Sequence, residues 1–442
     1  MNPVVGVPGV DFSLHDVRGT FPEELEITPL HRPPDVSIRV PGSKSVTNRA
    51  LLVAALADGP SRITNPLFSD DSYWLMDALV KLGFGLSADR EGGEVRLEGR
   101  GGEIPAPDVD LFVGNAGTVA RFLPPALALG PGPYTVDGAP RMRERPISDL
   151  VEGMRQLGAA VDYAGETERY PLRIGGGGIR GGTARIPGAR SSQFASGLLM
   201  AAPYAESPVT LRVDGREQWP YIGITVAVMR SFGVDVTRAP DLFSVRPTTY
   251  KPANYAVEPD ASAASYFLAA AAATGGSVKV PGLGSSSTQG DLRFAEALQQ
   301  MGCDLHLTPD SIRVQGPDRL RGVDVDMNAF SDTMMTLAAI APFASGPTTI
   351  RNVAHTRHQE TDRLSATAAE LHRLGVPTQQ TASSIRIIPQ TPRPAAVRTY
   401  GDHRMAMAFA VTGLVAPGVV IRDPGCVTKT FPDFFGRLGE LR

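Results

Sequence analysis

The sequence predicts a mixed α/β fold of two domains, each built from three copies of one repeated unit. Three observations support this prediction. Apolar, helix-like runs that open on polar residues recur along the 442 residues at intervals of 71, 76, 69, 72 and 70 residues. A strand pattern follows each run after a Gly or Pro break, and a second helical segment follows each of these strands. The six runs begin near Lys44, Asn115, Ser191, Asp260, Asp332 and Asp402.

Each predicted strand alternates polar and apolar residues or is rich in β-branched side chains, which suit a pleated sheet. In five copies the second helix ends at a Leu-Gly-like pair, because glycine accepts the left-handed backbone of a helix stop. Two short strands, such as CDLHLTPDSIRVQG, then close a β-α-β-α-β-β unit. The predicted strands are SRITNP, PYTVDG, PVTLRV, GSVKVP, PTTIRN and VVIRDP, and the glycines are Gly83, Gly158, Gly233, Gly302 and Gly375.

Six units divide naturally into two domains of three, which fits the usual domain size of about 100–200 residues. We expect the first domain to cover residues 43–257, and the second to cover residues 258–442 together with 1–42. The sixth copy reaches the C-terminus with too few strands, so the N-terminal segment LEITPLHRPPDVSIRV is predicted to complete it. Residues 1–24 match no repeat, and we expect them to form a flexible extension.

The composition limits the classes of partner. The net charge of −3 gives no reason to expect nucleic acid or an anionic membrane. The two cysteines, Cys303 and Cys426, form neither a disulfide framework nor a zinc motif, which indicates a reducing compartment. The N-terminus lacks a signal-peptide pattern, and the longest apolar run, near Tyr266–Thr274, is too short for a bilayer. We therefore expect a cytoplasmic monomer.

The first three helix starts carry neutral and basic side chains. A helix N-terminus exposes unpaired N–H groups and a partial positive charge, so it attracts anions. Lysine, hydroxyl and guanidinium groups suit phosphate or carboxylate, and a glycine lets a ligand approach the backbone closely. The candidate binding residues are Lys44, Ser45 and Arg49 at the first start, Asn115, Gly117 and Thr118 at the second, and Ser191, Ser192 and Gln193 at the third.

The last three starts carry acids instead, namely Asp260, Asp332 and Asp402. Helix capping is the competing interpretation for each, and it is strongest for Asp260. Other competing interpretations are a local ion pair for Glu360 with Arg363, a packed core residue for His403 and a packed aromatic for Tyr221. Basic candidates at equivalent points of the repeat are Lys44, Arg145, Arg363, Arg404 and Lys429.

Several common motifs are absent from the sequence. It contains no GxxxxGK[ST] loop, no GxGxxG after a strand with an acid beyond, no HExxH, no paired CxxC and no GxSxG. Neither a nucleotide nor a metal is therefore required by the sequence. A group of five cations with one or two carboxylates suggests a substrate with several negative charges and chemistry that transfers protons.

Seven motifs closely resemble those of the 5-enolpyruvylshikimate-3-phosphate synthase (EPSP synthase) family: PGSKSVTNRALLVAALA, GNAGTVAR, PRMRERPI, SSQF, HTRHQETDRL, DHRMAMAF and KTFPDFF. They follow the family's order from about Leu25 to the C-terminus. The resemblance implies an inside-out α/β barrel of two domains that close on shikimate 3-phosphate and phosphoenolpyruvate. It also implies enolpyruvyl transfer to the 5-hydroxyl with release of phosphate, without a metal or organic cofactor.

The resemblance further implies roles for individual residues. The catalytic set is Lys44, Asp332, Glu360 and His403, with Asp332 near the attacking hydroxyl and Glu360 near the methylene carbon. Shikimate 3-phosphate would contact Lys44, Ser45, Arg49, Ser191, Ser192, Gln193, Gln218, Tyr221, Asp332, His355 and Gln359. Phosphoenolpyruvate would contact Lys44, Asn115, Gly117, Thr118, Arg145, Gln193, Glu360, Arg363, Arg404 and Lys429.

The chain departs from the family pattern at four positions. His355 and Gln359 replace a common Asn and Lys, Gln218 replaces a usual serine, and Phe122 stands where many members have proline. A lost charge-assisted hydrogen bond could weaken binding by roughly 1.5–3 kcal/mol. The response to the inhibitor glyphosate therefore stays open.

Two alternatives to this function also stay open. One is the sister enolpyruvyltransferase that acts on UDP-N-acetylglucosamine, although neither cysteine lies between Asn115 and Pro146, where that family usually places a reactive one. The other is a divergent paralogue with a related acceptor or only an anion-binding role.

Overall fold

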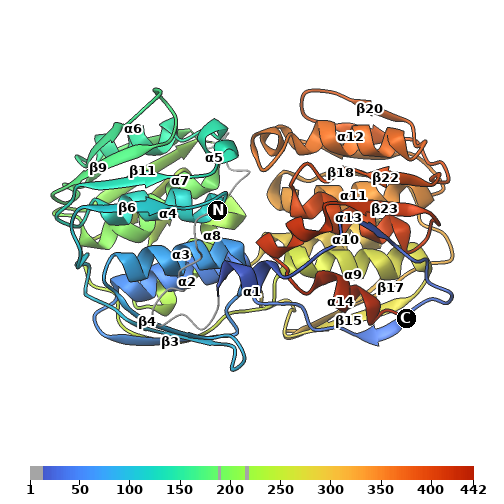
Figure 1. The fold of residues 1–442 in the computed structure, drawn as a ribbon, viewed down its shortest axis with the longest axis horizontal. Coiled ribbons are helices and arrows are strands. Elements are labelled where there is room, and N and C mark those ends of the chain that lie inside the picture. Colours follow the sequence, from blue (N-terminus) through green and yellow to red (C-terminus); the bar gives the residue numbers. More distant parts are fainter. Residues whose placement is uncertain (1–12, 188–190, 215–218) are drawn as a thin grey trace. The chain divides into compact units, whose positions relative to one another are not determined.

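The structure is a computed structural model that describes residues 13–187, 191–214 and 219–442. Its contacts divide the chain into two compact units, each with its own hydrophobic core. Among the described residues, unit 1 comprises Gly42–Val257 with those up to Val17, and unit 2 comprises Glu258–Arg442 with Arg18–Pro41. Figure 1 labels many of the helices and strands of both units.

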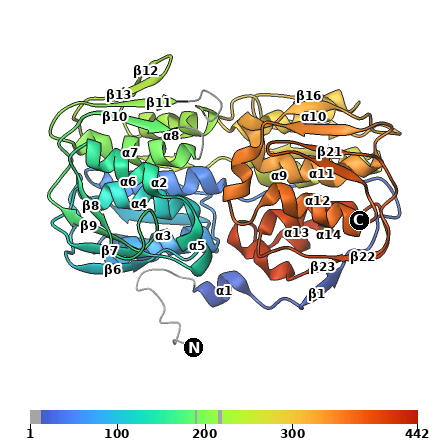
Figure 2. The ribbon, with the colours of Figure 1, turned by 90° about the horizontal axis from the view of Figure 1, so that it is seen from above.

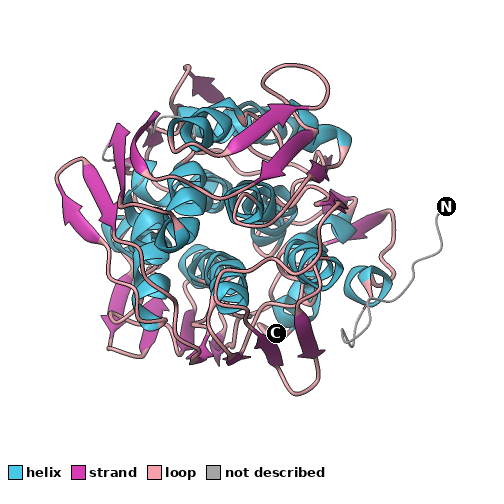
Figure 3. Cartoon of the chain, turned by 90° about the vertical axis from the view of Figure 1, so that its left-hand side faces the viewer, coloured by secondary structure: helices cyan, strands magenta, loops and turns pink. Residues whose placement is uncertain are grey.

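Unit 1 has its helices inside and its strands outside, an arrangement that Figure 3 shows. All residues of α4 (Gly117–Leu127) are buried, as are residues 46–56 of α2 (Lys44–Leu56). A helix that is apolar all round belongs in a core. The other helices are α1 (Leu14–Arg18), α3 (Asp70–Lys81), α5 (Pro140–Glu144), α6 (Ser148–Gln156), α7 (Ser192–Ala201), η1 (Ala202–Tyr204) and α8 (Trp219–Ser231).

Three four-stranded sheets surround these helices, in the orders β14-β3-β5-β4, β6-β7-β9-β8 and β10-β11-β13-β12. In each sheet the first strand of the order is parallel to the second, and the remaining pairs are antiparallel. The strands are β3 (Pro60–Thr64), β4 (Gly85–Asp89), β5 (Glu94–Glu98), β6 (Val109–Phe112), β7 (Tyr134–Asp137), β8 (Ala160–Tyr163), β9 (Leu172–Gly176), β10 (Gly182–Pro187), β11 (Val209–Asp214), β12 (Thr237–Ala239), β13 (Leu242–Val245) and β14 (Asn254–Ala256).

Unit 2 follows the same plan, with α9, α11 and α13 inside it (Figure 2). Residues 261–272 of α9 and every residue of α13 are buried. The helices are α9 (Ala261–Thr274), η3 (Gly290–Arg293), α10 (Phe294–Gln300), η4 (Asn328–Thr333), α11 (Met334–Ile340), η5 (Ala341–Phe343), η6 (Ala354–His358), α12 (Arg363–Arg373), α13 (His403–Gly413), η7 (Pro424–Lys429) and α14 (Phe434–Gly439).

The sheets of unit 2 have the orders β2-β15-β17-β16, β18-β19-β21-β20 and β22-β23-β1. Their strands are β1 (Glu24–Glu26), β2 (Asp35–Ser37), β15 (Ser277–Pro281), β16 (Asp304–Leu307), β17 (Ser311–Gln315), β18 (Asp324–Asp326), β19 (Thr348–Arg351), β20 (Thr378–Gln380), β21 (Ile385–Ile387), β22 (Ala395–Val397) and β23 (Val419–Arg422).

The predicted N-terminal completion of the sixth copy is confirmed for β1 only. Leu25 in β1 pairs with Ile421 in β23, which adds an antiparallel strand to the sixth sheet. β2 instead pairs with β15 and therefore belongs to the fourth sheet. The N-terminal segment thus contributes to two sheets of unit 2.

The predicted pattern of strands and helix stops is confirmed. All six strands predicted after the first helices are present as β3, β7, β11, β15, β19 and β23. The five predicted glycines after the second helices have φ between +79° and +101°, a backbone conformation that L side chains rarely adopt.

The N-terminal assignment needs a correction. Residues 1–42 were expected to belong with the C-terminal domain, and 1–24 to be a flexible extension. Residues 14–18 form α1 instead, and Val17 is buried in the core of unit 1 because its apolar side chain packs there. Residues 1–12 lie outside the described part of the chain.

Candidate active site

Two of the three acidic starts act as helix caps. The Asp260 carboxylate accepts the N–H of Ala263 at 2.9 Å at the start of α9, so the capping interpretation is confirmed for Asp260. The Asp402 carboxylate accepts the N–H of Arg404 at 2.9 Å at the start of α13. Asp332 lies inside the 3₁₀ helix η4 and caps no helix, so its carboxylate is available to side chains.

In unit 2 the structure brings most of the predicted acids and cations together. They form one connected set of hydrogen bonds and ion pairs, here named the arginine–carboxylate network. The network contains three cations and three carboxylates, so its formal charges balance. Its members are Asp332, Gln359, Glu360, Arg363, Asp402, Arg404 and Lys429.

Arg363 lies at the centre of the network and is 1% exposed. Its Nε donates to Asp402 Oδ2 at 2.7 Å, and its Nη2 donates to Glu360 Oε2 at 2.8 Å. Its Nη1 donates to Asp332 Oδ1 at 3.2 Å and also to Gln359 Oε1. The ion pair predicted for Glu360 and Arg363 is therefore present, but it is one part of a larger network.

The other two cations of the network, Arg404 and Lys429, contact the second carboxylate oxygens of Asp332 and Glu360. Arg404 Nη2 donates to Asp332 Oδ2 at 2.6 Å, and Lys429 Nζ lies 3.4 Å from Glu360 Oε1. Arg404 Nη1 also donates to the hydroxyl of Tyr266 at 3.4 Å. Asp332 and Glu360 are thus each held from two sides by cations, which fixes the position of each carboxylate.

Burial and charge act in opposite directions on these arginines. Burial alone would lower the pKa of Arg363, yet Asp402, Glu360 and Asp332 raise it above its ordinary value. Burial would likewise lower the pKa of Arg404, but Asp332 raises it well above its ordinary value. Both arginines are therefore firmly protonated.

Two histidines lie beside the network. His355 Nε2 is 2.7 Å from Ser331 Oγ, and burial lowers the pKa of His355 in spite of the nearby Asp332. His403 is fully buried at the start of α13, with Nδ1 3.5 Å from Asp402 Oδ1. Its burial fits the competing core interpretation, and the catalytic assignment of His403 stays a prediction.

In unit 1 the central cation is Arg49, which is 2% exposed. Its Nε donates to Thr225 Oγ1 at 2.6 Å, and its Nη1 donates to the carbonyl oxygen of Ser45 at 2.7 Å. Its Nη2 donates to Ser196 Oγ at 3.2 Å and to the carbonyl of Tyr221 at 3.3 Å. Burial lowers the pKa of Arg49 to about 9, and a weaker opposing effect comes from Tyr255.

Phe122, one of the positions that depart from the family pattern, packs against this arginine. The guanidinium carbon of Arg49 lies 4.7 Å from the centre of the Phe122 ring. A cation over an aromatic face is attracted by the ring quadrupole. The phenylalanine therefore stabilises the charge of Arg49 in a place where proline would offer no aromatic ring.

Lys44 and Thr118 lie near the starts of α2 and α4. Lys44 Nζ lies 3.8 Å from Asp71 Oδ2, and the Lys44 side chain is 12% exposed. Asn48 Nδ2 donates to Thr118 Oγ1 at 2.6 Å, which ties α2 to α4. Neither Asp71 nor Asn48 was predicted from the sequence.

Gly117 and Arg145 meet closely at the start of α4. A Cβ atom on Gly117 would lie 2.7 Å from Arg145 Nη2 and 3.0 Å from its Nη1. Arg145 Nη1 also donates to Asn115 Oδ1 at 3.5 Å. The start of α4 thus brings together Asn115, Gly117 and Arg145, and any side chain at position 117 would force this guanidinium to move.

The third predicted helix start is the start of α7. Ser191 caps α7 by accepting the N–H of Gln193 at 3.2 Å, and Ser192 is 7% exposed. The carbonyl of Tyr221 binds Arg49, so its backbone has a role that the sequence did not predict. Gln218 lies outside the residues that the structure describes.

Sequence reasoning missed residues whose partners are distant along the chain. Thr225 is 176 residues from Arg49, and Asp402 is 39 residues from Arg363. Arg121, within the quoted GNAGTVAR motif, donates to the carbonyl of Pro146 at 3.0 Å and is 2% exposed. The recurrence of acids at the helix starts was the one signal that could have indicated that Asp402 binds a residue of the neighbouring repeat, namely Arg363.

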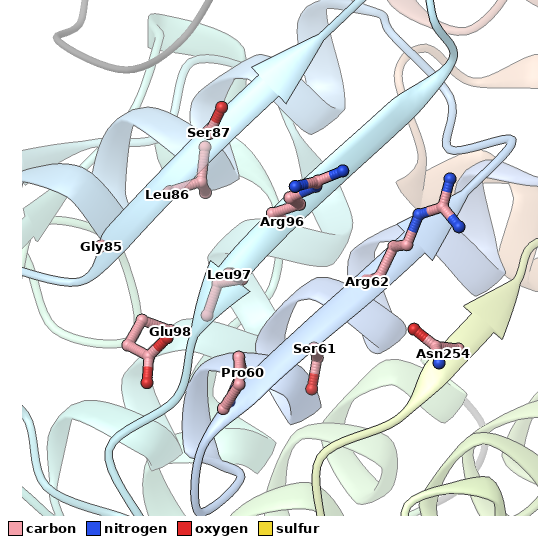
Figure 4. Close-up of a pocket in the computed structure, with 10 residues that line it drawn as sticks. All are labelled: Pro60, Ser61, Arg62, Gly85, Leu86, Ser87, Arg96, Leu97, Glu98 and Asn254. Carbon is pink, nitrogen blue, oxygen red and sulfur yellow. The ribbon is translucent and has the colours of Figure 1, made fainter.

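A surface depression of about 570 Å³ lies elsewhere on unit 1 (Figure 4). Residues of β3, β4, β5 and β14 line it, among them Arg62, Arg96 and Glu98, and none of the predicted site residues does. Among the described residues, no group of three or more His, Cys, Asp or Glu could hold a metal ion. Within the same residues, no helix has the length and apolar character needed to cross a membrane.

These features define a class of two-unit, six-sheet α/β proteins in which buried arginines and carboxylates gather at the starts of central helices. The EPSP synthase (3-phosphoshikimate 1-carboxyvinyltransferase) family matches residues 33–438 of the chain. The chain therefore belongs to the EPSP synthase family.

Individual relatives agree with this assignment. A 3-phosphoshikimate 1-carboxyvinyltransferase of a Nostoc species is 48% identical over 422 residues, covering 95% of this chain and 99% of the relative. The solved EPSP synthase of Acinetobacter baumannii has a TM-score of 0.81 and 26% identity, covering 95% of this chain and 98% of that chain. The enolpyruvyl transferase NikO of Streptomyces tendae, at 18% identity and a TM-score of 0.75, covers 95% of this chain and 97% of its own and shares the fold. The predicted fold class and family are confirmed.

Proposed function

We propose that the protein is a 3-phosphoshikimate 1-carboxyvinyltransferase of the shikimate pathway, which leads to the aromatic amino acids. It transfers the enolpyruvyl group of phosphoenolpyruvate to the 5-hydroxyl of shikimate 3-phosphate and releases phosphate. Relatives with this name match 95% of the chain, and the family matches residues 33–438. The proposal includes two small-molecule substrates and no cofactor.

The arginine–carboxylate network is the observation that supports this chemistry most directly. The reaction needs one group that takes a proton from a hydroxyl and another that gives a proton to a carbon. Asp332 and Glu360 are separate carboxylates that bind different nitrogens of Arg363, at 3.2 Å from its Nη1 and 2.8 Å from its Nη2. A shared cation fixes both groups while leaving each a distinct position.

The proposed steps follow from these positions. Asp332 accepts the proton of the 5-hydroxyl while Glu360 donates a proton to the methylene carbon of phosphoenolpyruvate, which becomes a methyl group. The hydroxyl oxygen forms a bond to the adjacent carbon and gives a tetrahedral intermediate. Glu360, left as a carboxylate by the first step, then takes a proton from the methyl group while the bond to the phosphate oxygen breaks, which gives the enol ether and free phosphate.

The cations have the chemistry needed for the anionic groups of both substrates. Charge-assisted hydrogen bonds from arginine and lysine bind carboxylate and phosphate strongly. We propose that Arg145, Arg363, Arg404 and Lys429 bind phosphoenolpyruvate and that Lys44, Ser45 and Arg49 bind shikimate 3-phosphate. Preorganised cations of this kind also stabilise charge that develops in the transition state.

The cysteines disfavour the sister enolpyruvyltransferase. Neither Cys303 nor Cys426 lies between Asn115 and Pro146. Burial raises the pKa of the Cys303 thiol to about 12, and burial also raises the pKa of Cys426. Because the thiolate is the reactive form of cysteine, neither thiol is suited to nucleophilic chemistry.

Phosphate release from phosphoenolpyruvate tests the proposal. The purified protein is assayed with shikimate 3-phosphate or with UDP-N-acetylglucosamine, and the organic product is identified by mass. We expect release with shikimate 3-phosphate alone and a product that carries the enolpyruvyl group. Release with the sugar nucleotide alone, or with neither acceptor, would contradict the proposal and favour one of the two alternatives.

Location and assembly complete the proposal. We propose a cytoplasmic enzyme, since its two cysteines form no disulfide framework. We also propose that the enzyme acts as a monomer. Sedimentation at several protein concentrations should give a mass near 46.9 kDa. A mass that rises with concentration would contradict the monomer.

A further inference from the structure

Glu370 is a buried carboxylate that the proposed mechanism does not use. It lies in α12, seven residues after Arg363, and it is 0% exposed. A carboxylate is seldom buried without partners. The partners of Glu370 therefore indicate why the fold retains it.

Its carboxylate holds the segment between β22 and α13. Glu370 Oε1 accepts the hydroxyl of Tyr400 at 2.6 Å, and Oε2 accepts the backbone N–H of Arg398 at 3.0 Å. Oε2 also accepts Nε of Arg373 at 2.9 Å. Two of the three donors thus belong to residues 398–400, which lead directly to the cap of α13.

The same segment is attached to α12 at a second point. Asp402 accepts Nε of Arg363 at 2.7 Å, and residues seven apart on a helix lie two turns apart on one face. Arg363 and Glu370 therefore hold residues 398–402 along one face of α12. Asp402 and Arg404, both in the arginine–carboxylate network, follow from this segment.

The backbone of the segment has an unusual conformation that needs such support. Tyr400 has φ of +57° and Gly401 has φ of +66°. A bulky residue rarely adopts positive φ, so a neighbouring interaction must stabilise it. The Glu370 carboxylate is bonded to the Tyr400 hydroxyl and to the N–H two residues earlier.

We propose that Glu370 is a positioning residue that sets the places of Asp402 and Arg404 by holding residues 398–400 against α12. The inference deepens the proposed function and rests on it, because Arg404 is there assigned to phosphoenolpyruvate. Glu370 itself touches neither reacting group. Its replacement should therefore affect the substrate that Arg404 binds.

Three variants separate positioning from general stability. Glu370→Gln keeps the size of the side chain but replaces one of its two acceptor oxygens with an NH2 group, which can only donate. Tyr400→Phe removes only the hydroxyl bond. Arg313→Gln is the control, because Arg313 in β17 binds Asp35 in β2 instead, from a side chain that is 48% exposed.

Steady-state kinetics with both substrates give the first readout. We expect Glu370→Gln to raise KM for phosphoenolpyruvate about 10-fold, with a smaller rise for Tyr400→Phe, because small displacements of binding groups are costly. KM for shikimate 3-phosphate and both constants of Arg313→Gln should stay within about twofold of the starting protein. An equal change in both KM values, or a change in Arg313→Gln as large as in Glu370→Gln, would overturn the proposal.

Hydrogen–deuterium exchange without substrates gives a readout that does not depend on the reaction. In Glu370→Gln we expect faster exchange in the peptide covering 398–404 and unchanged exchange in the sheet β18-β19-β21-β20. Faster exchange throughout unit 2, or none in 398–404, would overturn the positioning role. If the unmodified protein releases no phosphate with either acceptor, the proposed function fails, and this exchange measurement still decides the role of Glu370.

Discussion

The two units hold a buried arginine in opposite ways. Arg363 in unit 2 is bound by carboxylates of Asp402, Glu360 and Asp332. Arg49 in unit 1 is bound by hydroxyls, backbone carbonyls and an aromatic ring, and no carboxylate contacts it within the described ranges. Charge raises the pKa of Arg363, whereas burial lowers the pKa of Arg49 to about 9.

The difference indicates different uses of positive charge. No carboxylate among the described residues offsets the charge of Arg49, so an anionic ligand near it meets an arginine whose charge is not already paired with an acid. The charge of Arg363 is already balanced and instead fixes two carboxylates. Unit 1 thus holds its buried arginine without an acid, whereas unit 2 pairs its arginines with the two proposed proton-transfer carboxylates. Cations of both units are proposed to bind substrate anions.

Replacement of a carboxylate in each unit should give the largest contrast. Glu360→Gln should lower kcat by about 10²–10⁴-fold because it removes a proton-transfer group, while much of the substrate binding remains. Asp71→Asn in unit 1, beside Lys44, should lower kcat by less than about 10-fold. Turnover numbers of both variants measure this, and similar losses would break the comparison.

Removal of each arginine should separate stability from binding. Arg363→Met leaves several carboxylates without their central partner and should lower the free energy of unfolding by about 3–5 kcal/mol. Arg49→Met leaves neutral partners and should cost only about 1 kcal/mol, while weakening shikimate 3-phosphate binding about 10-fold or more. Urea unfolding and calorimetric titration distinguish the two. Equal losses of stability would show that the partners' charge does not matter.

A methyl group at Gly117 should reveal how closely Arg145 is packed. Gly117→Ala places a Cβ 2.7 Å from Arg145 Nη2, so the guanidinium must move and KM for phosphoenolpyruvate should rise about 10-fold. Gly223→Ala, in α8, is the control, since nothing lies within 4 Å of its added Cβ. An unchanged KM in Gly117→Ala would remove Arg145 from the binding group.

His355 should give the smallest effect, visible as a pH dependence of stability. Burial lowers its pKa below the ordinary value of about 6.5, so the unfolded chain binds the proton first as the pH falls. Above about pH 6.5 both states are neutral and its contribution to stability is fully present. Below that pH the contribution falls by at most about 1.4 kcal/mol per pH unit. The fall ends once the pH is below the lower pKa of the folded protein.

His355→Asn removes this titration. The difference in the free energy of unfolding between the unmodified protein and the variant should therefore change between pH 7 and pH 5, in the direction that disfavours the unmodified protein at low pH. Unfolding by urea at several pH values measures it. A difference that is constant with pH would contradict the buried, neutral state of His355.

The sequence by itself determined the repeated architecture. Period, strand pattern and glycine stops are local properties, because side-chain alternation and left-handed glycine depend on neighbouring residues. They predicted β3, β7, β11, β15, β19 and β23 and the positive φ of Gly83 and Gly375. The motifs also identified the family and most members of the arginine–carboxylate network.

Only the tertiary structure decided which residues meet. No local pattern says that Arg363 binds Asp402, that Arg49 lies on Phe122 or that β2 joins the fourth sheet. The apolar side chain of Val17 would suit the core of either unit, so the sequence could not assign α1. The structure places Val17 in the core of unit 1. Such pairings depend on the packing of central helices from different repeats, and the charge balance that separates Arg49 from Arg363 depends on them.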